Sequence, residues 1–157
     1  MDIMSSDISG RRLRNFGFVL KEVSRLYVLR FEERARELSL TLSQCKALVR
    51  LENNEGISQA RLAELTELDP MSIVRILDRM ESDGLLERRP DPADRRARCL
   101  YLTPKAKPLL EQIWRVSDAT RAQAFTGIGR AERDVCLAAM DQMHQNLSAP
   151  LGKSTPP

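Results

Sequence analysis

Two helix starts in the middle of this chain constrain its fold more than any other feature. Ser58, and Asp69 with the proline that follows it, are typical of helix starts. Ser and Asp side chains cap the free N–H groups of a first turn, and proline fits the first helical position. Gly84 is suited to end the second helix in the left-handed conformation. The sequence therefore predicts two short helices in succession.

A hairpin is expected directly after these helices. Residues 85–89 and 97–102 have the composition of two short strands, and a polar turn with two prolines separates them. Arginines gather in and beside this turn: Arg88, Arg89, Arg95, Arg96 and Arg98. Such a cluster alone is equally consistent with a solvated charged loop. Next to two short helices, contact with DNA phosphates or a narrow minor groove is favoured.

Helical patterns flank this central segment, residues 41–102, on both sides. Apolar residues recur at steps of three and four through residues 11–37, and further helices are expected over 103–125 and 130–147. Aromatic residues make up only 4% of the chain, which favours a helical core of aliphatic side chains. We predict a mainly α fold with a two- or three-stranded β wing: a winged helix-turn-helix core with terminal helices around it.

The second predicted helix is the candidate for contact with DNA bases. A helix fits the B-DNA major groove, and its N-terminal residues reach base edges. Met71, Ser72 and Arg75 lie nearest the leading end, and Arg79 flanks them. Arg75 can bind guanine through two hydrogen bonds, and Met71 or Val74 can contact a thymine methyl group. The net charge of +3 and the pI near 9.0 favour an anionic partner only weakly.

A run of linked motifs makes the chain resemble one known family. RILDRME at residues 75–81, GLLER at 84–88, DPADRR at 91–96 and LTPKA at 102–106 follow one another in order. Together they resemble the multiple-antibiotic-resistance regulator (MarR) family, and the flanking helices extend the likeness over nearly the whole chain. Pro70 departs from the family's usual lead into this helix, and we expect it to affect which bases are contacted.

The resemblance implies a function and roles for several residues. Members of that family are symmetric dimers that bind pseudo-palindromic operators, usually repress transcription, and in many cases leave DNA when a small molecule binds. By the same resemblance, Asp94 orients neighbouring arginines and Arg96 reaches the minor groove, with Arg95 beside it. Phosphate contacts are implied for Ser58, Gln59 and Ser72.

The resemblance also places a dimer interface in residues 11–37 and 103–147. The candidate interface residues are Leu13, Phe16, Leu20, Met140, Met143 and Leu147. For the N-terminal row, which continues to Val23 and Tyr27, the alternative is ordinary intramolecular core.

An effector pocket is expected where the terminal helices meet the winged core. Its candidate residues are Phe16, Tyr27, Cys45 and Trp114, with Arg14 or Arg30 facing a carboxylate. For each of them, a plain core or surface position is the alternative. By analogy with the family, the ligand is an aromatic acid or its thioester.

Several classes of function are not favoured by the sequence. Cys45, Cys99 and Cys136 are odd in number and far apart, which is typical of free thiols in a reducing compartment. We find no ligand spacing for a metal, no cofactor-binding loop and no catalytic set. The first ten residues lack an apolar signal segment, and no apolar run is long enough to cross a membrane. We expect a cytoplasmic protein without enzyme activity, with flexible ends over residues 1–10 and 148–157.

The sequence thus predicts a DNA-binding homodimeric repressor with a double-stranded operator and a small-molecule effector as partners. Two alternatives remain open at this point. One is a thiol-based redox sensor acting through Cys45. The other is a winged-helix module that binds DNA without sequence preference or binds a protein.

Overall fold

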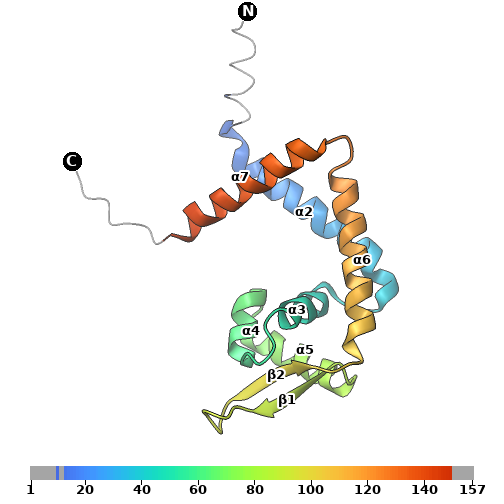
Figure 1. The fold of residues 1–157 in the computed structure, drawn as a ribbon, viewed down its shortest axis with the longest axis vertical. Helices are drawn as coiled ribbons and strands as arrows, with labels where there is room; N and C mark the ends of the chain where they lie inside the picture. The colour runs from blue at the N-terminus through green and yellow to red at the C-terminus, as the bar shows by residue number, and fades with distance from the viewer. Residues whose placement is uncertain (1–9, 11–12, 150–157) are drawn as a thin grey trace, which may run out of the picture. The chain divides into compact units, whose positions relative to one another are not determined.

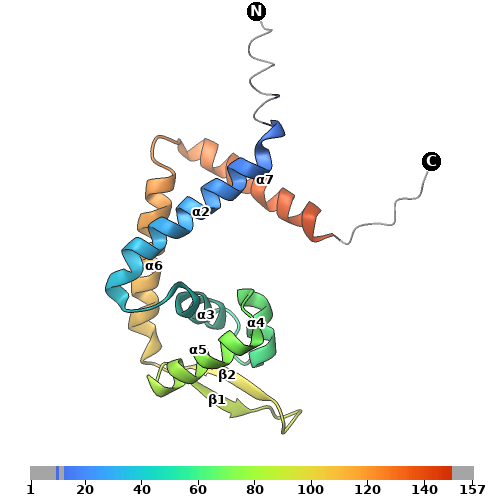
Figure 2. The same ribbon diagram turned by 180° about the vertical axis from the view of Figure 1, so that it is seen from behind.

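The computed structural model describes residue 10 and residues 13–149, which fall into two compact units divided after Thr120 (Figures 1 and 2). The first unit contains, in chain order, α2 (Phe16–Ala35), the 3-10 helix η1 (Arg36–Leu38), α3 (Leu42–Glu52), α4 (Gln59–Thr66), α5 (Pro70–Ser82), β1 (Leu86–Pro90), β2 (Arg98–Leu102) and most of α6 (Ala106–Ala124). The second unit contains the end of α6 and α7 (Arg130–Ser148). The predicted fold class, mainly α with a small antiparallel wing, is confirmed.

Both helix starts of the central segment are confirmed. The Ser58 hydroxyl oxygen accepts a hydrogen bond from the N–H of Arg61 at 3.2 Å, which caps α4. The Asp69 carboxylate accepts hydrogen bonds from the N–H groups of Met71 at 3.1 Å and Ser72 at 2.9 Å, which caps α5. These contacts are local in sequence, so each helix begins where its own residues dictate.

The wing has two strands and one isolated bridge. Gly84 has a φ of +73° and turns the chain from α5 into β1. β1 pairs antiparallel with β2, and Arg88 lies opposite Leu100. A single bridge joins Ser58 to Cys99 at the place where a third strand would lie. In Figure 1 the hairpin extends beyond α4 and α5, so that its turn is free of the helices.

The strands and the following helix begin later than predicted. β1 begins at Leu86 and β2 at Arg98, and α6 begins at Ala106, whereas the prediction began it at Thr103 as a cap. The Thr103 N–H instead donates to the Leu85 carbonyl at 3.0 Å, and its hydroxyl donates to the Gly84 carbonyl at 2.5 Å. Thr103 therefore ties the end of the wing to the end of α5.

The N-terminal helix is also shorter than predicted at its C-terminal end. α2 ends at Ala35, η1 follows, and Ser39 turns the chain with a φ of +54°. The predicted start at residue 11 lies outside the described residues.

The core of the first unit lies among α3, α4, α5, the wing and the first half of α6. Its fully buried side chains include Leu48, Leu51, Leu62, Ile73, Leu77, Met80, Leu86, Leu100 and Ile113. Burial of each such side chain stabilises the fold by roughly 1.5–3 kcal/mol. α5 contributes three of them, at helical spacing, so its opposite face is held towards solvent.

Candidate nucleic-acid interface

The outer face of α5 is exposed because its inner face is buried. Met71 is 69% exposed, and Val74, Arg75 and Asp78 are exposed as well. Ser72 is half-buried beside them. These four exposed side chains are one cation, one carboxylate and two apolar groups.

Arginines on this side of the molecule differ in whether an acid binds them. In the described part of the chain, the side chains of four form no hydrogen bond or ion pair: Arg75, Arg95, Arg96 and Arg98. Arg79 instead pairs with Asp83 at 3.0 Å, and Arg89 pairs with Glu87 and stacks over Tyr101 at 4.2 Å. The four unpaired arginines can therefore bind an anion without breaking an ion pair within the protein.

Arg88 is bound more extensively than any other arginine of this surface. Its guanidinium donates to Glu81 and, at 2.7 Å, to Asp78, and it reaches the Gln59 side-chain oxygen at 3.4 Å. The Arg88 N–H also donates to Glu81 at 3.2 Å. The side chain is only 18% exposed. The sequence predicted a DNA contact for Arg88, but its guanidinium is bound within the protein.

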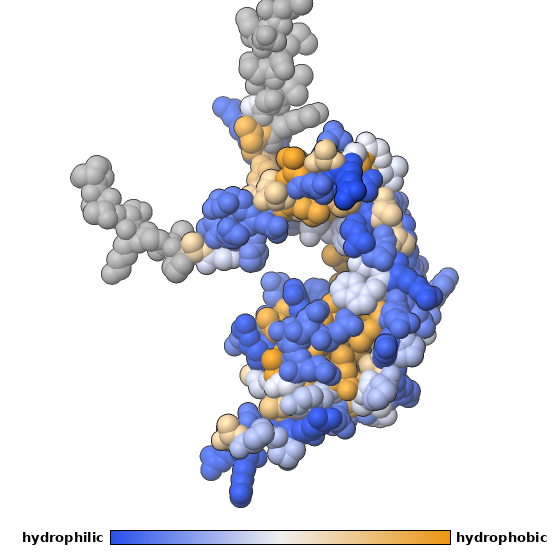
Figure 3. All heavy atoms as spheres, viewed as in Figure 1, coloured by the Kyte–Doolittle hydropathy of each residue, from blue (hydrophilic) through white to orange (hydrophobic). Residues whose placement is uncertain are grey.

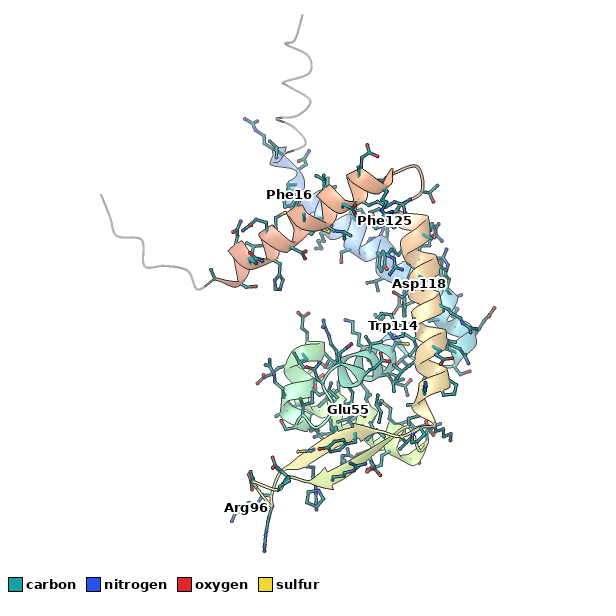
Figure 4. All side chains as sticks on the ribbon, in the orientation of Figure 1. Phe16, Glu55, Arg96, Trp114, Asp118 and Phe125 are labelled. Atoms are coloured by element: carbon teal, nitrogen blue, oxygen red, sulfur yellow. The ribbon has the colours of Figure 1, made fainter. Side chains whose placement is uncertain are left out.

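The turn of the hairpin is shaped by two aspartates. Asp91 accepts a hydrogen bond from the Ala93 N–H at 2.8 Å, and Asp94 accepts one from the Arg96 N–H at 2.9 Å. Each is an Asx turn, which fixes a loop locally. Figure 4 shows the Arg96 side chain at the tip of the hairpin, pointing away from the helices, and Figure 3 shows hydrophilic side chains around it.

The three predicted phosphate contacts lie at the starts of helices. Ser58 caps α4, Gln59 is its first residue, and Ser72 lies in the first turn of α5. The hydroxyl and N–H of Ser72 bind Asp69 and hold the pKa of that carboxyl below its ordinary value. Helix N-termini attract phosphates through their free N–H groups.

A cavity of about 390 Å³ lies within the first unit, between α2, α3 and α6. Three predicted pocket residues line it: Tyr27, Cys45 and Trp114. The other three, Arg14, Phe16 and Arg30, are not among its lining residues, and Arg30 pairs with Glu33 at 2.6 Å. The Trp114 indole N–H donates to Glu52 at 2.9 Å.

Two cations of the cavity were missed at the sequence level. Lys46 and Arg50, both on α3, line it together with the apolar side chains. Their spacing of one helical turn, beside Cys45 and Val49, was the available signal.

Cys45 is 2% exposed, and burial raises the pKa of its thiol to about 11. A reactive thiol needs exposure and a lowered pKa. The geometry therefore does not favour the redox alternative.

Apolar side chains are exposed on α7 and on α2 with the residues just before it, each within its own unit. In the first unit Leu13 is 75% exposed, and Phe16 and Leu20 are also exposed. In the second unit Leu147 is 83% exposed, Met140 is exposed and Met143 is half-buried. Large apolar side chains left in water are typical of surfaces that bind a partner.

Neither a metal site nor a membrane span is found in the part of the chain that the structure describes. It contains no group of three or more His, Cys, Asp or Glu side chains placed to hold a metal ion. Within the same residues, no helix is both long enough and apolar enough to cross a membrane.

These elements define a class of protein. Two short helices joined by a turn, with an exposed second helix and a basic hairpin beside it, form a winged helix-turn-helix, which places a helix in the major groove of DNA.

Comparison with known proteins specifies the family. A model of the MarR family matches residues 40–97. The solved transcriptional regulator PA3341 is 30% identical over 84% of this chain and 97% of its own, with a TM-score of 0.74. The transcriptional repressor CouR, solved with a 23-mer DNA duplex, is 27% identical over 85% of this chain and 95% of its own, with a TM-score of 0.72.

A third similar structure is BpsR of Bordetella bronchiseptica, whose DNA binding is regulated by 6-hydroxynicotinic acid. It is 25% identical over 85% of this chain and 94% of its own, with a TM-score of 0.71. The chain belongs to the MarR family of winged helix-turn-helix transcriptional regulators, which bind DNA and are not enzymes.

Proposed function

We propose that this DNA-binding regulator is a cytoplasmic homodimeric repressor that binds a pseudo-palindromic operator and leaves it when a small aromatic acid or thioester binds. The observation that carries the proposal is the free cation on the exposed face of α5. The Arg75 side chain has no hydrogen bond or ion pair among the described residues, and it lies in the second turn of the capped helix. A guanidinium in that position suits guanine in the major groove.

Other residues divide the remaining DNA contacts. Met71 and Val74 are exposed beside Arg75 and suit thymine methyl groups. Arg95 and Arg96 at the hairpin tip suit phosphates and the minor groove. Contacts of Ser58, Gln59 and Ser72 with phosphates fix the register, and Pro70 sets the first turn from which the bases are reached.

The dimer is supported by the exposed apolar side chains of the terminal helices. One winged module makes few contacts, and a second copy supplies the matching half-site about one helical turn along the DNA. Leu13, Phe16 and Leu20 on one unit, and Met140, Met143 and Leu147 on the other, are the proposed interface residues.

The effector is supported by the chemistry of the cavity. Its walls are mainly apolar, and Lys46 and Arg50 on α3 suit a carboxylate at one side. Tyr27 and Trp114 provide aromatic surface for a ring. The regulation of BpsR by an aromatic acid is consistent with this class of ligand.

The test is fluorescence anisotropy with the labelled intergenic DNA upstream of the protein's own gene. We expect nanomolar binding by two chains per site that survives scrambled competitor of equal length. Aromatic acids are then titrated against the complex, and release of the duplex is expected for the cognate ligand class. Equal competition by scrambled DNA would contradict operator reading and favour a module that binds DNA without sequence preference.

A further inference from the structure

Arg88 joins three elements of the DNA-binding unit through one side chain. It extends from β1, its guanidinium binds Asp78 and Glu81 on α5, and it reaches Gln59 at the start of α4. The partially buried position of the side chain strengthens these charge-assisted hydrogen bonds. A planar guanidinium can bind two carboxylates at once, which an ammonium group cannot do in the same way.

The position of Asp78 makes this contact relevant to DNA. Asp78 lies three residues after Arg75 on α5, and both side chains are exposed. Residues at that spacing on a helix are neighbours, and an acid and an arginine there form an ion pair readily. Yet Arg75 is unpaired in the described structure, and the Asp78 carboxylate is bound to Arg88 at 2.7 Å.

We propose that Arg88 is a positioning residue for sequence recognition: by binding Asp78 it keeps that carboxylate from pairing with Arg75, so that Arg75 remains free for a base edge. This inference rests on the proposed operator reading by α5. It gives Arg88 an indirect role and not a phosphate contact. The inference also predicts that Asp78 weakens base recognition when Arg88 does not bind it, because the free carboxylate then competes with DNA for Arg75.

The test is a rescue experiment in the full chain, with Arg88→Gln, Asp78→Asn and the double variant. The readout is the ratio of affinities for the intergenic duplex and for scrambled DNA of equal length. Arg88→Gln is expected to lower this ratio about tenfold, which lies within the roughly five- to 150-fold discrimination of a bidentate base contact. Asp78→Asn alone is expected to keep the ratio, and the double variant is expected to regain most of it.

Two further variants separate this role from simpler ones. Arg89→Gln is the matched control, since Arg89 is the next residue of β1 and binds only Glu87 and the Tyr101 ring. We expect it to keep the ratio. Arg88→Lys is used in case Arg88→Gln does not fold. It keeps the charge without the planar group, and we expect a reduced ratio that Asp78→Asn restores.

The outcomes against the inference are specific. A double variant as weak as Arg88→Gln would show that Arg88 only supports the fold. Equal loss of binding to both duplexes, with a salt dependence flatter by about 0.9 for each lost contact, would show a phosphate contact. Arg88→Lys with the ratio of the wild type would also overturn it. A wild-type protein without preference for the intergenic duplex would overturn the operator reading itself, and the inference with it.

Discussion

At the scale of single residues, Arg75 and Arg79 lie one helical turn apart on α5, and only one has an acidic partner. Arg79 is bound to Asp83 at 3.0 Å, whereas Arg75 is unpaired in the described structure. We therefore expect Arg75→Ala to weaken operator binding by about 1–3 kcal/mol and to relax the base preference at one position of each half-site. Arg79→Ala serves as the comparison, with a smaller expected loss. Anisotropy with single-base operator variants measures both. An unchanged preference in Arg75→Ala would rule out the base contact.

Cys45 gives a residue-scale prediction about pH. Burial raises the pKa of its thiol from 9.0 to about 11, so the fold favours the protonated form. The stability gained from this preference is complete below about pH 9 and is lost as the pH rises towards 11, by about 2–3 kcal/mol. Urea unfolding of the wild type and of Cys45→Ala, from pH 8 to pH 11, measures the difference between them. That difference should shrink with rising pH, and a constant difference would contradict the buried thiol.

Some residue roles could be predicted from the sequence, and others depend on contacts between distant segments. Ser58 and Asp69 cap the helices that they precede, and helical spacing alone places Arg75 on the exposed face. The binding of Arg88 to Asp78, and its reach to Gln59, joins separate elements that only the folded wing brings together. Charge and motif therefore favoured DNA contact for Arg88, while the folded arrangement gives it acidic partners.

At the scale of elements, the turn of the hairpin combines local rigidity with free cations. Asp91 and Asp94 fix the backbone through Asx turns, and the side chains of Arg95 and Arg96 form no hydrogen bond or ion pair in the described structure. Arg95→Gln removes one phosphate contact from each wing of a dimer, so the slope of log affinity against log salt should fall by about 1.8. Binding to operator and to scrambled DNA should weaken alike. Arg89→Gln in the same hairpin should leave the slope unchanged, and an unchanged slope in Arg95→Gln would exclude the phosphate contact.

The boundaries of helices could be predicted where they depend on local contacts, and not where they depend on contacts between distant segments. α4 and α5 begin where the sequence predicts, because their caps are bound within one helical turn. α6 begins later than predicted, because the hydroxyl and N–H of Thr103 donate to the carbonyls of Gly84 and Leu85, in the segment between α5 and β1. The cavity could not be predicted from local sequence for the same reason. Lys46 and Arg50 line it only because α3 packs beside α2 and α6 in the folded chain.

At the scale of the whole molecule, each unit exposes apolar side chains that a single chain leaves in water. If they form the proposed dimer interface, operator affinity depends on them although they lie outside the winged core. Met140 on α7 is exposed and is one of the proposed interface residues. A carboxylate buried there without a partner opposes association strongly.

Met140→Glu is accordingly expected to give a monomer that loses at least about tenfold in operator affinity, because only one half-site is then occupied at a time. Light scattering after size exclusion measures the mass, and anisotropy measures the affinity. Gln145→Glu is the control, since it adds the same charge at a polar, exposed position of the same helix. A circular dichroism melt checks that both variants fold. If Met140→Glu stayed dimeric with full operator affinity, this face of α7 would lie outside the interface, and the apolar side chains of α2 would have to form it.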